Sequence, residues 1–498
     1  MSPGVSAAAL VTYRGFDPIA VSVAHPEIVL LSVQTDGSPS DVVLELASGP
    51  SRPLTNHGSG FYTTTVTHEE VLYGYQPDDV NRNFVGFLEI FSGASLLLRG
   101  SLFIEVHDAS IPDVAVNDLA PDMRASPRIV NIQVAHVDPG NLVLSEVTTR
   151  FYEEFPDSFD FLNIISTPNR FANRYHLLIR NFVDGIGLSI FDNSAAYGSD
   201  GVLQGINRYP ITGLFDLAET ASLHELGHQW INFSDLPALQ GVIPHWPISS
   251  LAPGIMGFQH PSNPQGLAFP FDLVPIGGGD FLLVDVPRQR FFSGMELYLM
   301  GMARASQAGS YFVFQNQNQT VCGGCILEGP TEDVTANDWI AHEGPRVPVF
   351  PDAQVDYRVA TILVSRSRLL TDREMQVFDF FAARGEAEVE LPYSSGFSKG
   401  TTLPFKLATL GVGSLDARLG FASCQAANGE EFILSDDTIL TSQTYEACNT
   451  IIVGPNLTVL GPDGELILRA GQSVVLHDGA TVGTGGKLAV EIDPSLVP

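Results

Sequence analysis

The chain has 498 residues, of which 44% are hydrophobic and 16% charged, with 47 glycines and 33 prolines. This composition excludes a disordered chain, which has few apolar residues, and a coiled coil, which tolerates few glycines and prolines. The 25 basic and 56 acidic residues give a net charge of −31, so the surface repels phosphate backbones and anionic lipid. We therefore expect no nucleic-acid partner and no membrane insertion, and the length predicts about three domains.

Residues 15–112 are predicted to form the first domain, a β-sandwich. Short runs rich in Val, Leu, Phe and Thr alternate with turn residues, as in VLLSVQTDG and NFVGFLEIF. Antiparallel strands joined by turns produce this spacing, and about 100 residues of them suffice for two packed sheets. The segment resembles the Ig-like modules that precede catalytic domains in secreted bacterial proteins. Residues 108–127 carry prolines and aspartates without periodicity, and we expect a linker there.

Residues 125–395 are predicted to form a central α/β or α+β domain, because strands and helices mix along this stretch. A strand is indicated by RIVNIQVA, a buried strand by FDFLNIIS, and helices by SEVTTRFYEEFPD, FSGMELYLMGMARA and LTDREMQVFDFFAARGE. A further amphipathic helix is expected over DLAETASLHELGHQWINF. A capping box between Asp216 and Glu219 is predicted to open this helix.

Residues 420–498 are predicted to form a small β-rich, solenoid-like domain. Short β runs are separated by glycine-containing turns, as in TIIVGPNLTVLGPDGELILRAG. Successive rungs that lean on one another give such a repeat. This tail resembles C-terminal modules of secreted bacterial proteins.

The cysteines and the N-terminus bear on the cellular compartment. Cys322 and Cys325 form a CxxC motif without the second ligand pair of a zinc knuckle, so we expect a local disulfide. Cys424 and Cys448 bracket a polar segment, as a second disulfide would. The N-terminal apolar run has no basic segment before it and is not a signal peptide. Either the protein is intracellular or its leader has been removed, and the cysteine pairs favour a secreted protein.

The motif HELGH, residues 224–228, is the strongest chemical signal in the chain. Residues four apart lie on one face of a helix, so the imidazoles of His224 and His228 can reach one cation. Glu225 lies about 100° around the helix axis, where it can take a proton from a water beside the metal. Gly227 leaves room for another segment to approach the same face.

This motif resembles the active-site helix of the zincin metallopeptidases. The later sequences HW, GIMG and SGMELYLMG resemble secreted, little-characterised bacterial zincins, and the resemblance covers about residues 128–395. It implies Zn²⁺ as the cofactor, His224 and His228 as ligands and Glu225 as the general base. The central domain would then be of the zincin type.

Two residues compete to be the third zinc ligand, since a catalytic site has three protein ligands and an open position. The metzincin pattern places a histidine at position 234, where this chain has Ser234. His245 lies in a proline-flanked loop and is followed by GIMG, which resembles a Met-turn. Glu296 lies in the apolar helix MELYLM, as the ligand glutamate of gluzincins lies on a second helix. We take His245 as the third ligand and Glu296 as the alternative.

The sequence therefore predicts a secreted zinc endopeptidase acting on protein or peptide substrates. Its alternative is a surface adhesin or binding protein whose zinc site is structural or vestigial. An extended substrate is expected to align on a strand edge near FDFLNII or RYHLLIRN. His176, in the second run, is expected to be a hydrogen-bonded core or cleft-edge histidine. The oligomeric state is left open.

Overall fold

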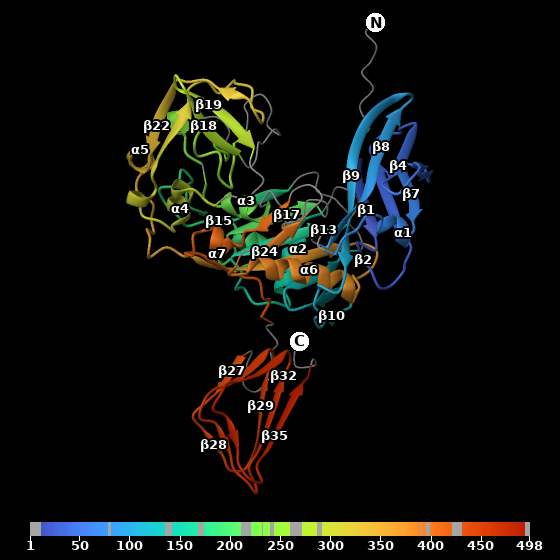
Figure 1. The fold of residues 1–498 in the computed structure, drawn as a ribbon, viewed down its shortest axis with the longest axis vertical. Helices are drawn as coiled ribbons and strands as arrows, with labels where there is room; N and C mark the ends of the chain where they lie inside the picture. The colour runs from blue at the N-terminus through green and yellow to red at the C-terminus, as the bar shows by residue number, and fades with distance from the viewer. Residues whose placement is uncertain are drawn as a thin grey trace.

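The protein is multidomain and rich in β-strands, and its helices are short. Figure 1 shows an N-terminal group of strands beside a central body, with the C-terminal strands set apart below it. In the stretches described, no helix is long and apolar enough to span a membrane. The computed structural model describes residues 11–77, 81–134, 142–167, 174–210, 221–231, 233–239, 244–258, 271–285, 291–389, 391–394, 399–420 and 431–493.

Two sheets that share one apolar core form the N-terminal unit. Their strand orders are β1-β3-β7-β6 and β2-β9-β8-β4-β5. Alternate residues of β3 and β8, such as Leu31, Val33, Leu88 and Ile90, point into the shared core, because successive strand residues face opposite sides of a sheet. The elements are β1 Val11–Asp17, β2 Ala20–Ser22, β3 Val29–Thr35, β4 Asp41–Leu46, β5 Arg52–Pro53, β6 Thr55–Asn56, β7 Phe61–Val66, α1 His68–Val71, β8 Arg82–Ser92 and β9 Ser95–His107.

The expected linker over residues 108–127 is partly wrong. Strands β10 (Asn117–Ala120) and β11 (Met123–Ala125) form a hairpin within it and join the central sheet. Met123 and Ala125 are buried on alternate positions, so this short polar segment is held by pairing and packing. The N-terminal unit also packs directly on the central body, where the backbone N–H of Ile19 donates to the carboxylate of Glu374 at 2.9 Å.

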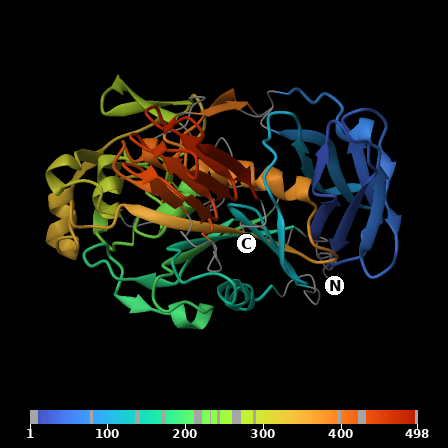
Figure 2. The same cartoon turned by 90° about the horizontal axis from the view of Figure 1, so that it is seen from below.

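A mixed sheet in the order β10-β11-β12-β23-β13-β17-β14 organises the central body. Strands β12, β23, β13 and β17 run parallel to one another, whereas β14 pairs antiparallel with β17 at the edge of the sheet. Helix α2 packs on one face through Val147 and Phe151, and α6 packs on the other through Met375 and Phe378. Figure 2 shows this body from below, with the N-terminal unit beside it. Because β26 pairs with β23, the central body extends past the predicted end at residue 395.

The largest apolar core of the central body contains Trp230, Trp246 and Trp339. The helices are α2 Leu144–Tyr152, α3 Ala221–Gly227, α4 Gly294–Met300, α5 Ala336–Glu343, α6 Asp372–Gly385 and α7 Phe405–Ala408, with the short 3₁₀ turns η1 Ser194–Tyr197, η2 Pro237–Leu239 and η3 Ala305–Gln307. The strands are β12 Ile129–Gln133, β13 Phe161–Ser166, β14 Tyr175–Leu178, β15 Arg180–Asn181, β16 Phe191–Asp192, β17 Gly205–Pro210, β18 Phe271–Gly277, β19 Asp280–Asp285, β20 Ser310–Phe314, β21 Ile326–Leu327, β22 Thr331–Thr335, β23 Asp356–Ser365, β24 Leu391–Ser394, β25 Lys399–Thr402 and β26 Ser414–Asp416.

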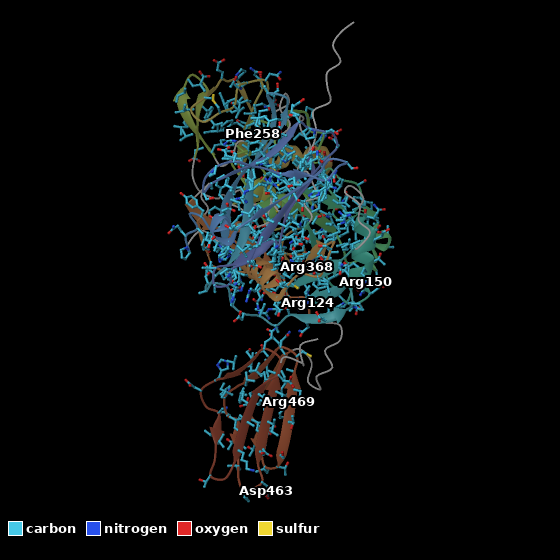
Figure 3. The ribbon with its side chains drawn as sticks, turned by 90° about the vertical axis from the view of Figure 1, so that its right-hand side faces the viewer. Arg124, Arg150, Phe258, Arg368, Asp463 and Arg469 are labelled. Carbon is cyan, nitrogen blue, oxygen red and sulfur yellow. A yellow bond between two sulfur atoms is a disulfide. The ribbon has the colours of Figure 1, made fainter. Side chains whose placement is uncertain are left out.

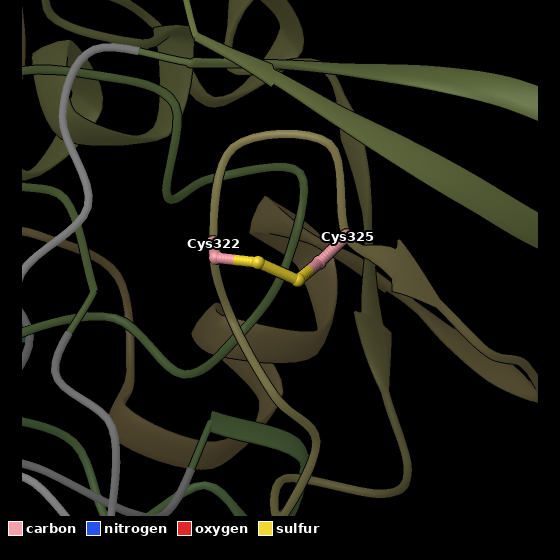
Figure 4. The surroundings of a disulfide bond; sticks show 2 residues. All are labelled: Cys322 and Cys325. Carbon is pink, nitrogen blue, oxygen red and sulfur yellow. A yellow bond between two sulfur atoms is a disulfide. The ribbon is translucent and has the colours of Figure 1, made fainter.

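The predicted local disulfide between Cys322 and Cys325 is confirmed. It closes a short loop just before β21, and Figure 4 shows its surroundings. Cys424 lies outside the described residues, so its pairing with Cys448 stays a prediction.

Three turns of chain stack on one another in the C-terminal unit. Each turn contributes one strand to each of three parallel sheets, ordered β27-β30-β33, β28-β31-β34 and β29-β32-β35. The Ig-like, zincin-type and solenoid-like assignments of the three units remain predictions. The strands are β27 Glu431–Leu434, β28 Thr438–Ile439, β29 Ser442–Ala447, β30 Thr450–Val453, β31 Thr458–Val459, β32 Glu465–Ala470, β33 Ser473–Leu476, β34 Thr481–Val482 and β35 Lys487–Ile492.

Candidate metal centre

Helix α3 carries the first four residues of the HELGH segment and ends just before the fifth. The N–H of His228 still donates to the carbonyl of His224 at 3.3 Å, so the helical turn continues through both histidines. The next two N–H groups bond only three residues back, which tightens the last turn and ends it. The predicted helix through residue 233 is therefore too long. Its predicted cap, Asp216 with Glu219, lies outside the described residues.

Gly227 is the point at which a second segment approaches α3. A side chain at this position would collide with the sulfur of Met256. Met256 belongs to the GIMG sequence, which therefore packs directly beneath the helix. The loop over residues 244–258 is fixed against α3 at this point, and the same loop carries His245.

Three histidines converge at this loop. The Nε2 atom of His224 lies 3.1 Å from Nε2 of His228 and 3.2 Å from Nε2 of His245. One ligand atom of each residue lies within 4.8 Å of the others. His224 and His228 are buried and His245 is half-buried. The structure thus brings together the three histidines that the sequence favours as ligands.

The protonation of these rings suits a cation. His224 donates its Nδ1–H to the carbonyl of Ile255 at 3.0 Å, which leaves the lone pair of Nε2 facing the other rings. Burial and the neighbouring His245 lower the pKa of His224 to about 3. Burial and the neighbouring histidines hold the pKa of His228 well below its usual value. Neutral imidazoles are the form that binds metals.

The geometry of the cluster fits zinc. A tetrahedral site with Zn–N bonds near 2.0–2.1 Å separates two nitrogen ligands by about 3.3 Å. The separations of 3.1 and 3.2 Å between the imidazole nitrogens are close to that value. Three histidine ligands also match the donor set of catalytic zinc, which keeps its fourth position for water or substrate. His224, His228 and His245 are therefore the residues that would hold the ion.

Glu225 lies beside the cluster and outside it. Its carboxylate is 3.2 Å from Nε of Arg174 and accepts the backbone N–H of His176. Burial raises the pKa of Glu225 to about 7, and the charge of Arg174 opposes that rise. Arg174 directly precedes β14, so the edge strand of the sheet positions the carboxylate.

His176 ties that edge strand to the end of α3. Its Nε2 lies 3.0 Å from Oε1 of Gln229, and its Nδ1 lies 2.7 Å from Oδ1 of Asn207 on β17. Asn207 in turn donates to Asn163 on β13 at 2.9 Å. His176 is therefore a hydrogen-bonded core histidine, as predicted. This buried network ties β14 to Gln229, the residue that follows the HELGH segment.

The two candidate substrate edges have different outcomes. β13 lies between β23 and β17, so it offers no free edge, and that expectation is wrong. β14 is the last strand in the sheet order and has one strand neighbour among the described residues. The run RYHLLIRN therefore keeps its place as the candidate edge.

Glu296, the alternative third ligand, lies outside the histidine cluster and has a structural role. It is completely buried and accepts hydrogen bonds from Nε1 of Trp246 at 2.8 Å and from the backbone N–H of Ser293 at 2.6 Å. Burial raises its pKa to about 7, against the hydrogen bonds from Ser293, Trp246 and the backbone of Met256. Glu296 caps α4 and fixes the loop that carries His245, instead of joining the histidine cluster.

No protein-family model, curated protein or solved structure matches this chain. Function is therefore inferred from the chemistry of the site itself.

Proposed function

We propose that the protein is a zinc-dependent endopeptidase. One observation carries the proposal: the imidazoles of His224, His228 and His245 converge beside a buried carboxylate, Glu225, which lies on the same helix as His224. A structural zinc site is normally closed by four protein ligands, whereas the three histidines leave one position for water. The proposal makes His224, His228 and His245 the metal ligands and Glu225 the general base.

The residues around the cluster divide the work of peptide hydrolysis. Bound zinc supplies Lewis acidity, which polarises a carbonyl and lowers the pKa of a water molecule. Glu225 takes a proton from the attacking water and returns it to the nitrogen of the leaving amine. Arg174 and the backbone N–H of His176 hold the carboxylate in place for both transfers.

The substrate chemistry follows from β14. An extended peptide that adds to this edge strand gains main-chain hydrogen bonds, whatever its side chains are. The peptide would then run past Glu225, which accepts a hydrogen bond from the same strand. The N-terminal Ig-like unit and the C-terminal solenoid-like unit are proposed as accessory modules of a secreted enzyme. The Cys322–Cys325 disulfide supports an oxidising compartment.

The substitution Glu225→Gln tests this function. It preserves the shape of the side chain and removes the proton acceptor, so zinc content should stay at the wild-type value. Hydrolysis of an unfolded protein substrate should fall by about 10²–10⁴-fold, the usual contribution of a general base. Glu69→Gln, an exposed change on α1, is the matched control and should leave hydrolysis unchanged.

Two results contradict the proposal. Undiminished hydrolysis by Glu225→Gln rules out this residue as the base. A wild-type protein that retains zinc, hydrolyses no peptide and unfolds when chelated would instead favour the binding-protein alternative with a structural site.

A further inference from the structure

The C-terminal stack ends in an open apolar turn. Leu488, Val490 and Ile492 of β35 lie in register with Leu466, Leu468 and Ala470 of β32, which are fully buried. They therefore face the interior of the stack, yet they are 38%, 47% and 46% exposed. No further strand covers them in the part of the chain that the structure describes.

The opposite end of the stack is different. Leu434, Ile439 and Ala447, the inward residues of the first turn, are buried. At the last turn, the inward residues Leu476 of β33 and Val482 of β34 are about as exposed as those of β35. All three sheets thus end in an open strand at the same place. Such an end combines unpaired backbone groups with apolar side chains, and stacked repeats need a cap there.

Charges on the outer face of the unit show what fits this end. Arg469 on β32 lies 2.6 Å from Glu446 on β29 and 3.1 Å from Glu491 on β35, so the charges alternate in sign along this row. A second row runs from Glu465 on β32 to Lys487 on β35, 3.9 Å apart. Figure 3 marks Arg469 on the strands of this unit. The open end therefore presents one negative and one positive charge on the same strand.

We propose that a second copy of this chain covers the open end, by antiparallel pairing of β35 with β35 centred on Ala489. Lys487 of one copy then lies opposite Glu491 of the second copy, and the two-fold axis makes the same pair twice. Both charge rows continue their alternation across the contact. Leu488 lies opposite Val490 of the second copy, so the apolar interior continues as well. A shift by one residue would turn these apolar side chains outward, which fixes the register.

Charge reversal in the full-length protein tests this interface. Analytical ultracentrifugation of the wild type should give twice the mass of one chain. Lys487→Glu and Glu491→Lys should each weaken dimerisation by about tenfold or more, because each puts like charges opposite each other twice. An equimolar mixture of the two single variants pairs opposite charges again and should restore the dimer.

The controls separate the interface from folding and from the proposed enzyme activity. Lys406→Glu reverses a lysine that pairs with Glu388 in the central body, and it should leave the dimer intact. Thermal melting checks that each variant is folded, and zinc content should not change in any of them. A wild type that is monomeric at every concentration overturns the proposal. So does a dimer that survives both charge reversals, or a mixture that stays monomeric.

Discussion

Two groups of side chains in the described residues have the composition and spacing of a metal site. One is the cluster of His224, His228 and His245, and the other comprises Asp235, His342 and Glu343. In both groups, one ligand atom from each residue lies within 4.8 Å of the others. Distance alone therefore does not separate them, and their surroundings do.

The second group lies largely in solvent, and two of its side chains hydrogen-bond to each other. Asp235 is 82% exposed, and its carboxylate accepts a hydrogen bond from Nε2 of His342 at 2.6 Å. This hydrogen bond is exposed to solvent, where interactions of this kind contribute about 0–1 kcal/mol. In the first group the Nε2 atoms of three histidines face one another. Burial lowers the pKa values of His224 and His228 and so keeps both rings neutral. A cation stabilises that arrangement, whereas in the exposed group Asp235 and His342 already hydrogen-bond to each other.

The largest expected effect is the loss of metal from the buried cluster. His245→Ala removes one of the three ligands, and zinc affinity should fall by more than about 100-fold, beyond the usual effect of changing a supporting residue. Competition with a chromogenic chelator measures this change. His25→Ala, at an exposed position in the N-terminal unit, is the control. Full zinc occupancy in His245→Ala would show that His245 is not a zinc ligand and that the buried cluster does not hold the ion as described.

Glu296 gives a second test, since its carboxylate is buried whereas Asp235 is exposed. Its pKa rises from 4.5 to about 7 on folding, so the folded state keeps the proton over this range and the unfolded state loses it. Its contribution to stability is therefore complete below pH 4.5 and is lost as the pH rises to 7, by about 3 kcal/mol. Glu225 has a similarly raised pKa, and the pKa values of His224 and His228 are lowered, so these groups also contribute to the pH dependence of the metal-free protein. Urea unfolding of the wild type and of Glu296→Gln at several pH values therefore gives the Glu296 contribution as the difference between the two.

Glu296→Gln should remove this contribution from the pH dependence of stability. The lost or altered hydrogen bonds to Trp246 and Ser293 shift the stability by a constant amount, so the pH dependence is the informative quantity. An unchanged slope in the variant would mean that another group titrates. The buried carboxylate would then be no different in this respect from the exposed ones.

Much of the site could be predicted because its signals are local. HELGH fixes two ligands and a carboxylate within one helical turn, and the loop before GIMG marks His245. The capping box from Ser293 to Glu296 is equally visible as Ser-x-x-Glu, and it explains why Glu296 turns back toward its own helix. That local pattern by itself favours a capping role for Glu296 over metal ligation.

The features that the sequence does not reveal depend on contacts between distant segments. Arg174 and His176 reach Glu225 because β14 pairs with β17 and packs on α3, and no short motif marks them. The β10–β11 hairpin resembles a linker in sequence because its apolar residues are few, with Leu119 and Ala120 on β10 and Met123 and Ala125 on β11. At the end of α3, the backbone hydrogen bonds change from acceptors four residues back to acceptors three residues back. The amino-acid composition of the segment does not show this change.

The smallest expected effect belongs to the exposed group. Asp235→Asn combined with His342→Gln removes the carboxylate of Asp235 and the imidazole of His342, two of the three potential ligands of this group. Because water compensates such groups, the free energy of unfolding should change by less than about 0.5 kcal/mol. Zinc content should stay at one ion per chain, as measured by mass spectrometry under native conditions. If the wild type binds two ions and this variant binds one, the exposed group also binds a metal. Solvent exposure and hydrogen bonding within a group would then not exclude a metal site. The buried cluster would then be distinguished only by its neighbour Glu225.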